Sequence, residues 1–110
     1  MDDVGAVGGG GVAIAEESEL GPGEELLRSP IEGQFYRRPA PEEPPYLEEG
    51  AAIAAGSVLG LVEVMKFFHP VRFERVGQWS LVRFLVDEGA AVDSGAPLAV
   101  IRKLSSGAGD

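Results

Sequence analysis

The chain of 110 residues contains no cysteine and a single histidine, His69. The absence of cysteine excludes a disulfide framework, a thiolate metal site and a cysteine nucleophile, and one imidazole cannot form a histidine cluster. No metal site is therefore expected. A chain without cysteine does not need an oxidising compartment for disulfide formation, so we expect a cytoplasmic protein.

Basic side chains are also scarce. Nine lysines and arginines face eighteen aspartates and glutamates, which gives a formal net charge of −9. This excess of negative charge works against binding to nucleic acid or to an anionic membrane surface. The N-terminal residues lack the positive flank and apolar run of a secretory signal, and the longest uncharged stretch, 50–62, is too short to span a membrane. We expect a soluble protein whose partners are other proteins.

Residues 1–28 lack aromatic side chains and any sustained hydrophobic period. They include a glycine run at 8–11 and several glutamates. Such a segment buries too little apolar surface to offset the entropy lost on ordering it. We predict a flexible leader over 1–28, a folded domain over 29–104 and a flexible tail over 105–110.

From residue 29 onward, short runs of β-branched and aromatic residues are separated by glycine or proline at intervals of roughly ten residues. No long helical stripe competes with them. The pattern predicts a small all-β sandwich or barrel. The expected strands span residues 31–36, 52–53, 58–64, 67–75, 81–86, 91–92 and 98–102.

The sequence also contains an internal repeat. Residues 49–62 align without a gap with 88–101, at an offset of 39, and Gly33-Gln34-Phe35 aligns with Gly77-Gln78-Trp79 at an offset of 44. The first half therefore carries five extra residues. Neither half is long enough to close a core alone, so we expect two small antiparallel sheets related by a pseudo-two-fold axis.

The repeat also suggests roles for two sets of side chains. The aromatics at equivalent positions, Phe35 and Trp79, are predicted to lie in the core. The carboxylate pairs at 48–49 and 87–88 precede equivalent glycines, and we interpret them as solvated turn residues rather than general acid–base pairs.

Residues 63–68, EVMKFF, connect the two halves and join two predicted long strands. A short connection between long antiparallel strands has to be a hairpin turn. Met65 and Lys66 differ from the Asn-Gly pair that such turns prefer, and conflicts of this kind are typical of functional sites. Taken alone, a Met-Lys pair is more often an ordinary surface feature.

These residues resemble the signature of the biotin carboxyl carrier family, the biotinyl domains of acetyl-CoA carboxylase. Glu63-Val64-Met65-Lys66 is similar to that family's Glu-Ala-Met-Lys, in which the lysine lies at an exposed hairpin turn and carries biotin on its ε-amine. The resemblance covers about 29–104 and implies a flattened barrel-sandwich hybrid. It also implies that Lys66 is the attachment site and that Met65, Glu63 and Val64 are its cofactor-binding neighbours.

The inserted residues support the same branch of the family. The stretch 33–47, GQFYRRPAPEEPPYL, resembles the family's Gly-Thr-Phe-Tyr-Arg-Ser-Pro-Ser-Pro-Asp-Ala-Pro-Pro-Phe-Val, a protruding "thumb" loop. Prolines fix φ and lower the entropy cost of ordering such a loop, which on its own would be interpreted as a spacer. The resemblance implies that the thumb lies near the biotin. The residues concerned are Arg38, Pro39, Ala40, Pro41, Glu42, Glu43 and Pro44.

The resemblance implies a carrier without a catalytic site of its own. A biotin protein ligase would attach biotin to Lys66. A biotin carboxylase would then load a carboxyl group, and a carboxyltransferase would deliver it to acetyl-CoA, forming malonyl-CoA for fatty acid synthesis. Glu63 would serve as a ligase recognition element or as an ordinary strand-edge carboxylate, and both interpretations stay open.

Three alternatives also stay open. A lipoyl domain is disfavoured by the thumb and by Met65, because the acceptor lysine of those domains usually follows aspartate. The carrier of another biotin-dependent carboxylase or decarboxylase would generally lack the thumb. An unmodified biotinyl-like adaptor would result if Phe67 and Phe68, which replace Met-Met or smaller apolar residues of the family, block the ligase.

Overall fold

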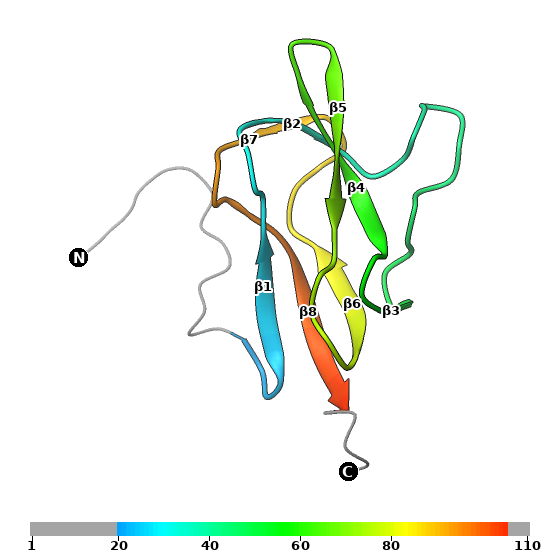
Figure 1. The fold of residues 1–110 in the computed structure, drawn as a ribbon, viewed down its shortest axis with the longest axis vertical. Helices are drawn as coiled ribbons and strands as arrows, with labels where there is room; N and C mark the ends of the chain where they lie inside the picture. Colours follow the sequence, from blue (N-terminus) through cyan, green and yellow to red (C-terminus); the bar gives the residue numbers. More distant parts are fainter. Residues whose placement is uncertain (1–19, 106–110) are drawn as a thin grey trace, which may run out of the picture.

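The computed structural model describes residues 20–105 as two antiparallel four-stranded sheets. One sheet has the strand order β1-β8-β6-β3 and the other β5-β4-β2-β7, and Figure 1 shows the β4–β5 hairpin projecting at one end. The predicted all-β fold is confirmed. The strands are β1 Glu24–Arg28, β2 Gly33–Tyr36, β3 Ala52–Ile53, β4 Val58–Val64, β5 Phe67–Arg72, β6 Gln78–Phe84, β7 Ala90–Val92 and β8 Pro97–Ser105.

Each sheet combines strands from both halves of the repeat. The offset of 44 carries β1 onto β5 and β2 onto β6, and the offset of 39 carries β3 onto β7 and β4 onto β8. Equivalent turns keep equivalent hydrogen bonds: the Gly56 N–H donates to the Phe73 carbonyl and the Gly95 N–H to the Ser29 carbonyl, both at 2.7 Å. The repeat seen in the sequence is therefore a structural pseudo-two-fold.

The predicted start of the folded domain at residue 29 is too late. Glu24–Arg28 forms β1, which pairs with β8 and buries Leu26 at 6% exposure. An edge strand needs only one apolar face, and its charged side chains are paired: Arg102 donates to the Glu24 carboxylate at 2.6 Å. The Gly21 N–H and this guanidinium lower the pKa of Glu24. The rest of the predicted leader, 1–19, and the tail residues 106–110 lie outside the described residues.

Several strand ends also differ from those expected. β2 begins at Gly33 instead of 31, and β5 ends at Arg72 instead of 75. β6 begins earlier, at Gln78, because Trp79 and Leu81 alternate into the core while their backbones pair with β8. Within residues 20–105, nothing helical has the length and apolar character needed to cross a bilayer.

The interior contains two hydrophobic clusters. Phe35 belongs to the one that includes Val62 and Leu98, and Trp79 belongs to the one that includes Phe73. The Trp79 and Phe73 rings pack edge to face with centroids 5.6 Å apart. The prediction that Phe35 and Trp79 are core aromatics is confirmed, since they are 0% and 4% exposed.

Two glycines let β2 lie close against β4. A Cβ atom at Gly60 would lie 2.6 Å from Phe35 Cε1, and one at Gly33 would lie 2.6 Å from Val62 Cγ1. Both neighbours are fully buried and cannot move aside without disturbing the core. The close approach of these strands therefore requires glycine at both positions.

We expect Gly60→Ala to destabilise the domain by about 1–3 kcal/mol, because the added methyl group overpacks the core against Phe35. The shift in the urea unfolding midpoint measures this loss. Gly21→Ala is the matched control, since its Cβ would meet nothing nearer than 3.5 Å. Equal midpoints for the two variants would show that β2 and β4 are not in close contact at Gly60.

Candidate functional site

Lys66 lies at the tip of the β4–β5 hairpin. Val64 pairs with Phe67 as the last pair of the ladder, which leaves Met65 and Lys66 as a two-residue turn. Their φ angles are 51° and 72°, and a type I′ turn requires positive φ at both central residues. Residues other than glycine pay about 1 kcal/mol or more each in this region. Met65 and Lys66, which are not the residues that such turns prefer, are therefore strained at the tip.

The tip is exposed and apolar around the amine. Met65 is 86% exposed, Phe67 72% and Phe68 54%, and the Lys66 side chain is exposed as well. Large apolar side chains gathered at one exposed place are typical of contact surfaces. The amine is thus presented to solvent within a patch suited to contact another molecule.

Glu63 and Val64 lie on β4 beside the tip. Glu63 is half-buried and pairs with Phe68 on β5 and with Gln34 on β2. Val64 packs against the core cluster that includes Phe35. Val64 therefore anchors the hairpin to the core, whereas Glu63 presents a carboxylate on the outer side of the sheet.

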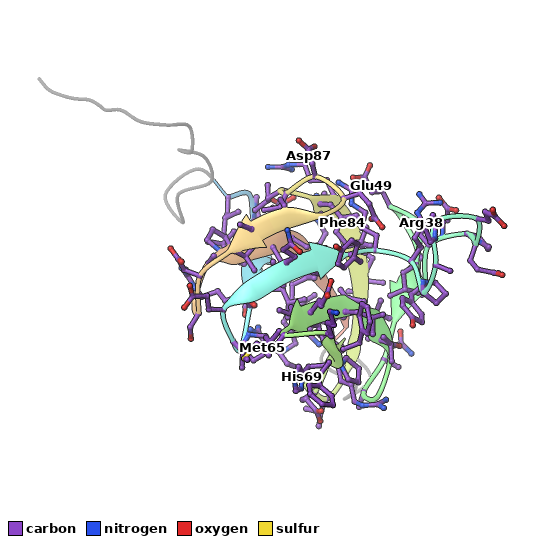
Figure 2. All side chains as sticks on the ribbon, turned by 90° about the horizontal axis from the view of Figure 1, so that it is seen from above. Arg38, Glu49, Met65, His69, Phe84 and Asp87 are labelled. Atoms are coloured by element: carbon purple, nitrogen blue, oxygen red, sulfur yellow. The ribbon has the colours of Figure 1, made fainter. Side chains whose placement is uncertain are left out.

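The thumb, residues 37–47, follows β2 and is fixed by hydrogen bonds. The Tyr46 N–H donates to the Arg37 carbonyl at 2.9 Å and closes its base. Within the loop, Arg38 Nη1 donates to the Glu43 carbonyl at 2.8 Å. Figure 2 looks down on the hairpin end and shows Arg38 on the thumb, to one side of the hairpin that carries Met65. The thumb is therefore an ordered loop beside the hairpin.

A groove of about 510 Å³ lies between the thumb and the hairpin. The Tyr36 and Phe68 rings form part of its wall, with centroids 6.3 Å apart. Cavities of this size suit small molecules. The groove is lined by Tyr36, Arg38, Pro39, Ala40, Pro41, Glu63, Phe68 and Glu88.

Carboxylates dominate the electrostatics of the groove. Burial raises the pKa of the Tyr36 phenol, and the negative charges of Glu63 and Glu88 raise it further. Glu88 also organises the site, because its Oε1 accepts a hydrogen bond from the Arg37 N–H at 2.7 Å and its Oε2 lies 3.8 Å from Arg38 Nε. The tyrosine thus stays neutral in a negative field.

The structure divides the predicted thumb residues into two sets. Arg38 to Pro41 line the groove, whereas Glu42, Glu43 and Pro44 are exposed and lie outside its lining. The Glu43 N–H donates to the Ala40 carbonyl at 3.0 Å, so the chain turns between Ala40 and Glu43, where the second set begins.

Tyr36 and Glu88 also line the groove, and neither was predicted as a site residue. Tyr36 belongs to the thumb motif and could have been found from it. No motif indicated Glu88, because it lies in the loop after β6, far in the sequence from the thumb and the hairpin.

One protein family matches most of the described part of the chain. The family described as "Biotin-requiring enzyme" matches residues 25–101. This chain belongs to that family. The match begins within β1, in agreement with the earlier domain boundary seen in the structure.

Curated relatives of this biotinyl domain carry the name biotin carboxyl carrier protein of acetyl-CoA carboxylase. The form 1, chloroplastic protein of Arabidopsis thaliana is 36% identical over 76 residues, which are 69% of this chain and 26% of the relative. The Haemophilus influenzae protein is 37% identical over 76 residues, 69% of this chain and 48% of the relative. The chain thus spans about half the length of these relatives or less. The resemblance predicted from the sequence is confirmed.

Solved structures share the biotinyl fold. A single-chain, multi-domain long-chain acyl-CoA carboxylase matches with a TM-score of 0.63 and 32% identity, over 78% of this chain and 8% of the other. The Kluyveromyces lactis urea carboxylase matches with a TM-score of 0.58 and 23% identity, over 82% and 7% of the two chains. The second likeness concerns the fold alone.

We expect Lys66→Gly to stabilise the biotinyl domain by about 1 kcal/mol, because glycine adopts positive φ without the penalty that lysine pays. Lys66→Arg keeps the penalty and serves as the control. Thermal unfolding of both variants beside the wild type measures the difference. Should Lys66→Gly unfold at or below the temperature of Lys66→Arg, the turn is not strained at this residue.

We expect the phenol of Tyr36 to titrate above the ordinary tyrosine range, and Glu63→Gln to lower its pKa by removing a nearby negative charge. A raised pKa contributes stability below the pKa of the unfolded chain, and this contribution is lost as pH rises through the folded-state pKa. Ultraviolet titration in a Tyr46→Phe background follows this single phenol. Glu74→Gln, an exposed carboxylate outside the groove, should leave the titration unchanged; equal curves for both glutamine variants would contradict the assigned cause.

Proposed function

We propose that this biotinyl domain is a biotin carboxyl carrier and that Lys66 holds biotin through an amide on its ε-amine. The observation that carries the proposal is the position of Lys66 at the exposed tip of the hairpin that joins the two halves. An amine attacks an acyl group through its free electron pair, so the ligase has to supply the base that removes the proton of the ammonium group. The role of the carrier is to hold the amine out on a rigid support.

The groove residues fit the chemistry of biotin. Tyr36 and Phe68 offer aromatic surface to an apolar ring system. The carboxylates of Glu63 and Glu88 can accept hydrogen bonds from ureido N–H groups, and Arg38 can donate to the ureido oxygen. The groove beside Lys66 therefore suits a neutral ureido ring.

We propose three protein partners for the carrier. A biotin protein ligase loads Lys66, and a biotin carboxylase and a carboxyltransferase use the loaded carrier in turn. Bound biotin supplies the capacity to take up a carboxyl group and give it to acetyl-CoA, which forms malonyl-CoA for fatty acid synthesis. The chain contributes the tether, which keeps the ring at an effective concentration of about millimolar at successive sites. The names of the relatives support this assignment, and the composition of the chain supports the cytoplasm as its compartment.

We expect co-expression with a biotin protein ligase to add one biotinyl group, seen as a single increment in intact mass. Lys66 and Lys103 are the two lysines of the chain, so Lys66→Arg should abolish the increment and Lys103→Arg should keep it. Peptide mapping then locates the group. A folded wild-type chain that takes up no biotin from any ligase would contradict the carrier and favour an unmodified adaptor.

A further inference from the structure

We propose that the groove between the thumb and the hairpin sorts the tethered ring by charge, holding it while it is neutral and releasing it when it carries an anionic carboxyl group. This inference rests on the proposed function, because it requires a ring tethered at residue 66. It concerns what the residues of this chain do to the ring between two partner enzymes.

The groove lining has more carboxylates than cations. Its charged members are Glu63 and Glu88, which are negative, and Arg38, which is positive. The neighbouring Arg37 lies outside the lining, where its guanidinium packs 4.5 Å from the Phe84 ring centroid and donates to the Val86 carbonyl at 2.6 Å. The lining therefore carries one net negative charge.

Two nitrogens of the Arg38 guanidinium already have partners within the protein. Arg38 Nη1 donates to the Glu43 carbonyl, and its Nε lies near the Glu88 carboxylate. Among residues 20–105, no lysine or arginine forms an ion pair with Glu63. Glu63 is thus the half-buried carboxylate whose charge an incoming anion would meet.

The phenol of Tyr36 lies in the groove beside the same two carboxylates. Burial raises the pKa of this phenol most, and the negative charges of Glu63 and Glu88 raise it further, so these carboxylates oppose a negative charge on its oxygen. A carboxyl group on the ring would bring a negative charge to the same place. A neutral ureido ring would instead offer N–H donors to those carboxylates.

The tether reaches the groove without rearrangement of the fold. Glu63 and Phe68 form the second ladder pair below the tip, and a strand rises about 3.3 Å per residue, so the groove begins about 7 Å from the turn. The lysine side chain with the acyl arm of biotin is longer than that. The ring can therefore occupy the groove and leave it while it stays attached.

The expected discrimination is about three- to tenfold in occupancy of the groove. Like charges several ångströms apart at a protein surface repel each other enough to produce an effect of this size, and added salt reduces it. The consequence is directional: the loaded ring is set free when it has to reach the next enzyme, and the unloaded ring is sheltered afterwards.

The absence of cysteine allows a direct test. In the full chain, Lys66→Cys introduces a single thiol, to which three haloacetyl probes are coupled in turn. The first carries biotin, the second biotin with a carboxymethyl group on a ureido nitrogen, and the third the carbamoylmethyl isostere, which has the same shape without the charge. Backbone amide shifts of Tyr36, Ala40 and Phe68, relative to a probe without a ring, measure how much of the ring is docked.

We expect biotin and the carbamoylmethyl probe to dock alike, and the carboxymethyl probe to dock three- to tenfold less. Glu63→Gln should restore docking of the carboxymethyl probe to within about twofold of its isostere. Glu74→Gln, whose side chain is exposed and outside the groove, should change nothing.

Three results would overturn the proposal. The charged and neutral probes could dock equally in the parent chain, Glu63→Gln could leave their ratio unchanged, or biotin itself could produce no shifts at the groove. Coupling through a thiol bypasses the ligase, so these outcomes are independent of whether Lys66 accepts biotin in the mass experiment.

Discussion

The fold depends on the exchange of strands between the two halves of the chain. Each half contributes two strands to each of the two sheets, so neither half can bury its apolar residues without the other. Phe35 and Trp79, equivalent in the repeat, are buried in separate clusters, and the two sheets close over both. In the β4–β5 hairpin that joins the halves, β4 contributes Leu59 and Val62 to this core and β5 contributes Val71, whereas the tip residues from Met65 to Phe68 are exposed. The end of the molecule that carries Lys66 is therefore supported by the core without being part of it.

Strain at the tip follows from this arrangement. Val64 packs against the core and pairs with Phe67, and the next pair, Glu63 with Phe68, continues the ladder. These pairs leave two residues to reverse the chain, whichever residues they are. Met65 and Lys66 adopt positive φ because the ladder requires it. An unstrained tip would need glycine, which has no side chain, so the strain of the turn and the presence of an amine at the tip have the same origin.

The repeat allowed most strands to be predicted, because alternating apolar residues and equivalent glycines recur at fixed offsets. β1 was missed because its glutamates and the glycine-rich residues before it are typical of a linker. Its position was nonetheless encoded, since Glu24–Arg28 lies 44 residues before Phe68–Arg72, the offset that relates β2 to β6. The groove could be predicted only in part. The thumb motif indicated one wall, but the contribution of Glu88 depends on the hydrogen bond from Arg37 and on packing between distant loops.

The two phenylalanines after Lys66, which depart from the family motif, have different environments. Successive side chains of a strand point to opposite faces, so Phe67 and Phe68 cannot both face the thumb. Phe68 lines the groove and lies against Tyr36, whereas Phe67 is 72% exposed and outside that lining. An aromatic ring at 68 offers the groove a larger apolar wall than a smaller side chain would, directly opposite Glu63 in the ladder. Phe68, which in the sequence is a departure from the family motif next to the acceptor lysine, thus adds apolar surface to the groove in the structure.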